Sequence, residues 1–200
     1  SHHVLPVLDF DRTRLDSVEL YPFKKAVEAG VGGVMIGHLH VSELDEKPAS
    51  ISSEVITSLL RKELHFSGLV FTDALEMKGI SKNADDLCVQ ALMAGNDMLL
   101  VPRNLKKSLE SVMRAVKSGK LTEDVITEKC RKVLTYKYAL GLSHKQQVAA
   151  EGIENRICSA KSDSLMIALE KAAVTVLKDS VDVLPLDLSL SENILLSLSS

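Results

Sequence analysis

Short apolar runs separated by amphipathic segments form the pattern of the first 142 residues. The runs at 31–36, 69–71 and 98–101 are too short and too uniformly apolar for amphipathic helices, and such runs are typical of buried parallel strands. Helical spacing of apolar residues follows each residue or segment that favours a helix N-terminus, namely Pro22, 50–53, Asn83, Asn104 and Thr122. This alternation, with a period of about thirty residues, predicts the βα units of a parallel sheet.

The pattern leaves the architecture of that sheet open. Three βα units suit a portion of a TIM-type (β/α)8 barrel, but an open doubly wound sheet has the same local pattern. After a polar segment, a helix is predicted at 162–173 and a strand at 174–177. We therefore expect an α/β protein with a βα domain at 1–142, a linker at 143–161 and the beginning of a second, truncated α/β domain at 162–200.

One predicted strand ends in a carboxylate. The run at 69–71 follows Gly68 and leads into Thr72 and Asp73. Catalytic side chains of α/β barrels sit at the C-terminal ends of strands, because the strand is rigid and the loop after it is free to vary. Asp73 is therefore the leading catalytic candidate. The alternative is an acid that caps the next helix or closes a βα turn.

Charge and composition narrow the range of partners. The 24 basic and 27 acidic residues are mixed along the chain and give a net charge of −3, so nothing favours nucleic acid or a membrane surface as a partner. No apolar run approaches the ~20 residues of a membrane span. The three cysteines lie singly, and no cluster of ligand residues has the spacing of a metal site. We therefore expect neither a metal nor an organic cofactor.

Four stretches carry a more specific signal, namely DALEM at 73–77, VMIGH at 34–38, PASIS at 48–52 and LRKELHFSG at 60–68. By these stretches, residues 1–142 resemble the C-terminal part of the catalytic barrel of glycoside hydrolase family 3, on the branch of the bacterial β-N-acetylhexosaminidases. Residues 160–200 match less closely the start of the α/β sandwich that follows this barrel in two-domain members. The resemblance implies that an N-terminal half-barrel precedes this chain in the full-length protein.

The resemblance also implies roles for individual residues. Asp73 matches the catalytic nucleophile, which forms a covalent glycosyl-aspartate. Ser1 and His2 match the end of the Asp-Ser-His loop whose histidine is the general acid/base of this branch; the alternative for His2 is the remnant of a purification tag. Met77 would line the sugar site as an apolar wall. His38 either lies beside the sugar at the barrel mouth or caps a strand through a ring hydrogen bond.

The implied activity is that of a retaining exo-β-N-acetylhexosaminidase acting on cell-wall or chitin-derived oligosaccharides with terminal GlcNAc-type residues. The β-glucosidase branch commonly has Trp after the nucleophile, whereas Ala74 follows Asp73 and the chain has no Trp. Transfer to phosphate in place of water, the aglycone, the oligomeric state and the compartment stay open.

Two further classes of function remain. The family's Lys-His and Gly-His-Gly-Asp-Thr segments are missing from these residues, so the chain alone lacks most of the sugar pocket. It could then be an inactive barrel fragment that binds glycan or packs with another chain. An aldolase-like lyase would need a Schiff-base lysine at a strand end, and no predicted strand ends in one.

Overall fold

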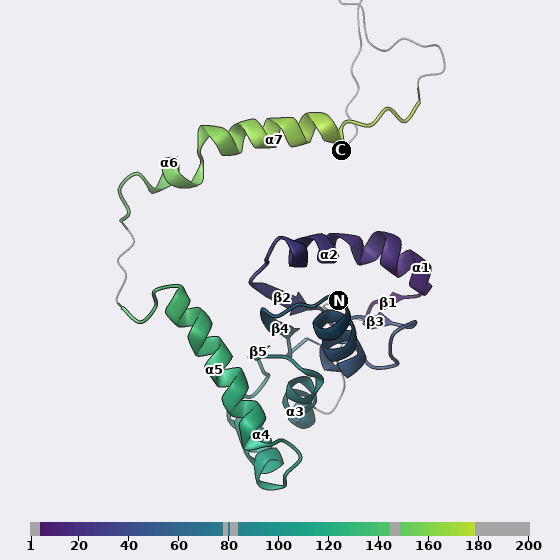
Figure 1. The fold of residues 1–200 in the computed structure, drawn as a ribbon, viewed down its shortest axis with the longest axis vertical. Helices are drawn as coiled ribbons and strands as arrows, with labels where there is room; N and C mark the ends of the chain where they lie inside the picture. Colours follow the sequence, from purple (N-terminus) through teal and green to yellow (C-terminus); the bar gives the residue numbers. More distant parts are fainter. Residues whose placement is uncertain (1–4, 78–79, 81–83, 145–148, 179–200) are drawn as a thin grey trace, which may run out of the picture. The chain divides into compact units, whose positions relative to one another are not determined.

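The computed structural model describes residues 5–77, 80, 84–144 and 149–178. The chain divides into two units, Ser1–Gln146 and Gln147–Ser200, and Figure 1 traces both. The domain and linker boundaries expected from the sequence stay predictions.

A three-stranded parallel sheet in the order β2-β4-β5 is the centre of the first unit. Its strands are β2 (Gly33–Ile36), β4 (Leu69–Ala74) and β5 (Met98–Leu100). The three strands expected from the apolar runs are therefore confirmed, and β4 continues beyond its apolar run to include Asp73. A separate parallel ladder joins two short strands that the sequence pattern did not predict, β1 (Val7–Leu8) and β3 (His40–Val41).

The two pairings of β4 differ in regularity. β2 runs alongside β4 without interruption, beginning with Gly33 opposite Leu69. The pairing of β4 with β5 shifts its register between Phe71 and Ala74, which is the segment that contains Asp73. An irregularity of this kind bends a strand and redirects its side chains, and such features are common next to active sites.

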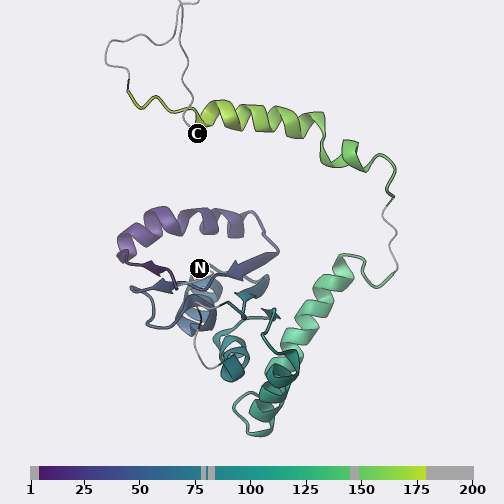
Figure 2. The ribbon, with the colours of Figure 1, turned by 180° about the vertical axis from the view of Figure 1, so that it is seen from behind.

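Helical segments connect the strands, as expected for βα units. The segment η3 (Glu54–Glu63) lies between β2 and β4, α3 (Ala84–Ala94) between β4 and β5, and α4 (Leu105–Lys117) follows β5. Figures 1 and 2 show α2 and α3 on different sides of the strands. The remaining segments of this unit are α1 (Arg12–Arg14), η1 (Leu15–Glu19), α2 (Tyr21–Glu28), η2 (Ala49–Ile51) and α5 (Glu123–Ala139).

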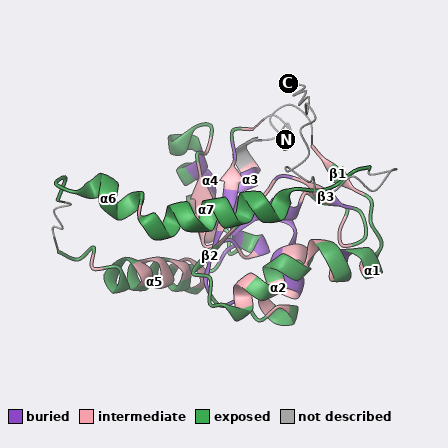
Figure 3. Cartoon of the chain, turned by 90° about the horizontal axis from the view of Figure 1, so that it is seen from above, coloured by how far each residue is buried: buried purple, intermediate pink, exposed green. Residues whose placement is uncertain are grey.

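The main apolar core joins β2, β4 and η3. Ile56 of η3 and Val70 of β4 are fully buried in this cluster, which also includes Ile36, Leu60 and Phe66. Buried positions, purple in Figure 3, concentrate in β4, η2, η3 and α3. Of the three strands, β4 is the most buried, with Leu69, Val70 and Thr72 inside, and a strand covered on both faces lacks the polar alternation of a half-exposed strand.

The apolar spacing of α4 predicts a core-facing side, and this prediction is correct only in part. The residues expected to face the core are Leu105, Leu109, Val112, Met113 and Val116. Val112 and Val116 pack against the cluster that contains Ala115, but the other three are exposed. The buried positions of α4 are instead the small residues Ser108, Ser111 and Ala115. Small side chains let α4 approach α3 closely, and Ala115 packs in one cluster with buried residues of α3.

The second unit contains the helices α6 (Ile153–Ile157) and α7 (Ala160–Ala173). The helix expected at 162–173 is confirmed by α7, whose N-terminus is capped by the Ser159 hydroxyl accepting from the Ser162 N–H at 3.2 Å. The strand expected at 174–177 is not formed, because no partner strand pairs with it in the described part of this unit. The later part of the expected second domain lies outside the described residues. None of the helices described in either unit has the length and apolar character needed to cross a membrane.

Candidate active site at the end of strand β4

Asp73 occupies the position just before the last residue of β4. Its side chain is half-buried, and its Oδ1 accepts a hydrogen bond from the N–H of Ala74 at 2.7 Å. The acid therefore lies at the C-terminal end of the central strand, where catalytic side chains occur in βα folds. Because α3 is described from Ala84, eleven positions later, Asp73 is not the N-cap of that helix, whereas its other alternative, an acid that closes the βα turn, stays open.

Thr72 fixes the strand immediately before Asp73. The side chain of Thr72 is fully buried, and its Oγ1 accepts a hydrogen bond from the N–H of Leu100 at 3.0 Å. The carbonyl of Leu100 accepts in turn from the N–H of Leu75 at 3.0 Å. A hydroxyl thus takes the place of a strand carbonyl where the β4–β5 register shifts. The sequence signal for this role was a threonine between an apolar run and an acid.

His38 follows β2 and contacts the same strand end from the other side. Its ring is 1% exposed; Nδ1 lies 2.6 Å from the Ser50 hydroxyl and Nε2 lies 3.0 Å from the carbonyl oxygen of Ala74. These bonds correspond to the structural alternative given for this residue, a histidine that caps a strand end. Contact of His38 with a sugar stays an untested prediction. Ser50 was considered only as a possible helix cap, and its role as the partner of His38 was missed.

Met77 lies in the turn that follows β4. Its backbone N–H donates to the carbonyl of Ala74 at 3.1 Å, and its side chain is half-buried. The expected role of Met77 as an apolar wall of a sugar site stays a prediction. His2, the expected general acid/base, lies outside the described residues, so its position relative to Asp73 is also a prediction.

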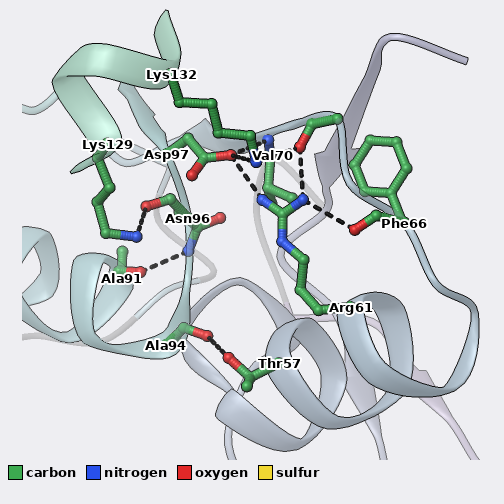
Figure 4. Close-up of polar contacts among 11 residues, drawn as sticks. Thr57, Arg61, Phe66, Val70, Ala91, Ala94, Asn96, Asp97, Lys129 and Lys132 are labelled. Atoms are coloured by element: carbon green, nitrogen blue, oxygen red, sulfur yellow. Dashed lines mark hydrogen bonds and ion pairs between the residues drawn. The ribbon is translucent and has the colours of Figure 1, made fainter. Parts of the chain in front are cut away.

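A second aspartate lies at the opposite end of the sheet. Asp97 directly precedes β5 and its side chain is 6% exposed. Figure 4 shows three donors around its Oδ2, namely Arg61 Nη2 at 2.6 Å, Lys132 Nζ at 3.0 Å and the Val70 N–H at 2.9 Å. The position of Asp97 directly before Met98 also predicts from the sequence an acid at a strand start, and the geometry agrees with this role. Residues at the N-terminal ends of the strands of a βα barrel usually contribute to stability and not to catalysis.

Two lysines of α5 complete the cluster around Asp97. Lys129 Nζ donates to the carbonyl of Asn96 at 2.7 Å, and Lys132 Nζ donates to the carbonyl of Gly68 at 2.7 Å. Burial lowers the pKa of Lys129, and the charge of Asp97 opposes this effect only in part. Burial also lowers the pKa of Lys132, against the hydrogen bond to Asp97. The cluster therefore docks α5 onto the strand starts, and both lysines lose hydration in doing so.

A parallel βα arrangement with an acid at the C-terminal end of a strand is typical of catalytic α/β barrels. Residues 1–136 match the family model described as "Glycosyl hydrolase family 3 N terminal domain". The chain belongs to this family, and the expected assignment to glycoside hydrolase family 3 is confirmed. The expected α/β class, as part of a TIM-type barrel, is confirmed with it.

Individual relatives agree with the family. The chain is 29% identical to "Beta-hexosaminidase A" of Pseudoalteromonas piscicida, over 93% of this chain and 34% of that protein. It is 25% identical to "Beta-N-acetylglucosaminidase/beta-glucosidase" of Cellulomonas fimi, over 82% of this chain and 31% of that protein. Among solved structures, it is similar to a family 3 β-N-acetylglucosaminidase from Paenibacillus sp. str. FPU-7, with 37% identity and a TM-score of 0.70 over 76% of this chain and 30% of that one. The chain thus spans about a third of the length of these relatives.

Proposed function

We propose that the full-length protein containing this chain is a retaining exo-β-N-acetylhexosaminidase with Asp73 as its nucleophile. The observation that carries the proposal is the half-buried carboxylate at the C-terminal end of β4, on a strand end that Thr72 holds in place. Membership of glycosyl hydrolase family 3 supports it. The chain matches about a third of the length of its relatives, and in the proposal further parts of the full-length protein supply the other strands of the barrel and most of the sugar pocket.

The chemistry needs an ionised carboxylate and one proton carrier. The Asp73 carboxylate attacks the anomeric carbon while the bond from that carbon to the leaving oxygen breaks, and the imidazolium of His2 gives the leaving oxygen its proton. Neutral His2 then takes a proton from water, whose oxygen attacks the same carbon and releases Asp73. After one turnover, His2 again carries its proton and Asp73 is again a free carboxylate. Two displacements at one carbon retain the anomeric configuration.

The amino sugar is the proposed substrate because of the named relatives. One is named a β-hexosaminidase and another a β-N-acetylglucosaminidase, while the Cellulomonas fimi protein carries both an N-acetylglucosaminidase and a glucosidase name. The chain has Ala74 where the β-glucosidase branch commonly has Trp. We therefore propose GlcNAc-type oligosaccharides from cell wall or chitin as the substrate class, with glucosides as the competing class to be tested.

Turnover of two aryl glycosides by the full-length protein tests the substrate class. We expect aryl N-acetyl-β-glucosaminide to be hydrolysed with a higher kcat/KM than aryl β-glucoside, and the first product to be the β-anomer by NMR. Preference for the glucoside would contradict the amino-sugar proposal. Saturable binding of the oligosaccharide without any release of sugar would favour the non-enzymatic alternative.

A covalent trap tests the nucleophile. The full-length protein is incubated with a fluorinated GlcNAc-type mechanism-based inactivator and the labelled peptide is mapped by mass spectrometry. We expect the label on Asp73. A label on another carboxylate, or undiminished hydrolysis by Asp73→Ala, would remove Asp73 from the mechanism.

A further inference from the structure

Three buried polar side chains form a hydrogen-bonded series that ends beside Asp73. Asn96 Nδ2 donates to the backbone carbonyl of Ser50 at 2.9 Å, and the Ser50 hydroxyl lies 2.6 Å from His38 Nδ1. His38 Nε2 lies 3.0 Å from the carbonyl oxygen of Ala74. Asn96 and Ser50 are 0% exposed and His38 is 1% exposed. The series crosses from the start of β5 through η2 to the C-terminal end of β4.

The partners of His38 determine where its ring proton lies. A backbone carbonyl only accepts, so Nε2 must carry the hydrogen that it donates to Ala74. A neutral ring then leaves Nδ1 as an acceptor, and the Ser50 hydroxyl donates to it. Both ring nitrogens are therefore satisfied without a charge, which is the form compatible with full burial.

The far end of the series is fixed as well. Asn96 Nδ2 donates to the carbonyl of Ala91 at 2.8 Å as well as to Ser50, so both partners are acceptors and the orientation of the amide is defined. The backbone carbonyl of Asn96 accepts from Lys129 Nζ, as Figure 4 shows. Asn96 is thus held by α3 and by α5, and it gives the Ser50 segment a rigid support.

At the near end, the peptide unit joining Ala74 to Leu75 is held on both sides. Its carbonyl accepts from His38 Nε2 and from the N–H of Met77 at 3.1 Å. Its N–H donates to the carbonyl of Leu100 at 3.0 Å. The N–H of Ala74 itself donates to Asp73 Oδ1. The residue that orients the carboxylate is therefore the residue that His38 anchors.

We propose that His38 is a positioning residue for Asp73, acting through Ala74 and supported by Ser50 and Asn96. This inference rests on the proposed function, because the orientation of the Asp73 carboxylate matters only if Asp73 is the nucleophile. Stability alone does not call for such a series, since replacing both partners of a buried hydrogen bond by apolar groups of the same shape is often nearly neutral. A carboxylate that must attack along one line needs its backbone fixed, and small displacements of reacting groups cost large factors in rate.

Two substitutions at His38 separate positioning from bulk packing. A glutamine amide reaches the place of Nε2 and retains a donor for Ala74, whereas an asparagine amide reaches only the place of Nδ1. In the full-length protein, we expect His38→Asn to lower kcat and the rate of covalent labelling of Asp73 by about 10- to 100-fold, with KM little changed. We expect His38→Gln to retain clearly more of both rates than His38→Asn.

His65→Asn is the matched control. His65 is exposed and has a φ of 56°, which asparagine tolerates, so the same exchange should leave kcat, KM and folding unchanged. All rates are measured well below the melting temperature of each variant. A folded His38→Asn with a kcat within about twofold of the wild type, or equal losses in His38→Asn and His38→Gln, would overturn the proposal.

Ser50→Ala keeps the test decisive if His38→Asn does not fold. It leaves the ring in place and removes the hydroxyl at Nδ1, so we expect a several-fold loss in kcat and labelling rate without a change in KM. Wild-type rates in a folded Ser50→Ala would contradict the series. The labelling experiment distinguishes failure of the proposed function from failure of the positioning role. A label on a residue other than Asp73 rejects the proposed function. A label on Asp73 with unchanged rates in the His38 variants rejects only the positioning role of His38.

Discussion

Asp73 and Asp97 lie at opposite ends of two neighbouring parallel strands, and their surroundings differ. Asp97, at the start of β5, directs one oxygen to Arg61, Lys132 and the N–H of Val70, and its side chain is 6% exposed. Asp73, at the end of β4, is half-buried. Within the described part of the chain, its carboxylate accepts one hydrogen bond, from the N–H of Ala74.

The difference separates an acid that holds the fold from an acid that is available for reaction. At Asp97 two cations offset the negative charge, and their removal would leave it buried without compensation. At Asp73 the fixed element is the backbone, through Thr72 and His38, while the carboxylate has no ion pair with a described residue. The same residue type therefore serves stability at the N-terminal ends of the strands and is proposed to serve catalysis at their C-terminal ends.

The strongest test replaces the carboxylate of Asp73, and then that of Asp97, by the uncharged amide of asparagine. Asp73→Asn in the full-length protein should lower kcat by roughly a thousandfold or more, because the amide is a poor nucleophile. Its melting temperature should stay near the wild-type value, since the amide oxygen still accepts from Ala74. Hydrolysis of an aryl N-acetylglucosaminide and a thermal melt measure both. A large fall in stability with little loss of kcat would reverse the roles given to the two acids.

Asp97→Asn should give the opposite result. Loss of the charge leaves Arg61 and Lys132 partly buried without their partner, so we expect the free energy of unfolding to fall by about 3–5 kcal/mol. Urea unfolding measures this change, and Asp73→Asn is its matched control. The folded fraction of Asp97→Asn should retain most of the wild-type kcat. Unchanged stability would mean that the cluster in Figure 4 contributes little to the fold.

A smaller effect is expected at the threonine that fixes the catalytic end of β4. Thr72→Val retains the shape of the side chain but leaves the Leu100 N–H without its acceptor, which should cost about 1–3 kcal/mol of stability. Thr135→Val, at an exposed position of α5, provides the control in the same urea titration. Equal stability of the two variants would show that the hydroxyl of Thr72 is dispensable.

The smallest effect concerns the pH dependence of the Asp97 cluster. Burial lowers the pKa of Lys129 from its ordinary value of 10.5, so between the two values the unfolded chain binds more protons than the folded chain. This group therefore makes stability rise with pH through that window. We expect Lys129→Met to show a weaker rise in urea midpoints as the pH approaches 10.5 from below. An equal rise in both proteins would assign the effect to other groups, Lys132 first.

Much of the candidate site was predictable because its signal is local. The strand at 69–71 is a short apolar run, and Asp73 stands directly behind it, so residue order alone places the acid at the strand's C-terminal end. The family stretches predicted the same acid and were confirmed at the level of the family. The structural alternative for His38 was foreseen, but its partner Ser50 was not, because the two residues lie twelve positions apart in the sequence.

Side-chain orientation on α4 was predictable only in part by the same means. Val112 and Val116 pack against the core as their spacing predicts. The two leucines are exposed, whereas Ser108, Ser111 and Ala115 are buried. Helical periodicity identifies a face but does not identify the neighbour that covers it. Here the close approach of α3 selected the small face.

The sequence by itself determined the three strands of the central sheet with the helices between them, the end of the strand that carries Asp73 and the family to which the chain belongs, because these depend on residues adjacent along the chain. Only the tertiary structure decided which aspartate is neutralised by cations and which is held through its backbone. Those distinctions arise from contacts such as Asp97 with Lys132 and His38 with Ala74, which join residues more than thirty positions apart. Burial gives such contacts their energy, and burial is a property of the folded chain.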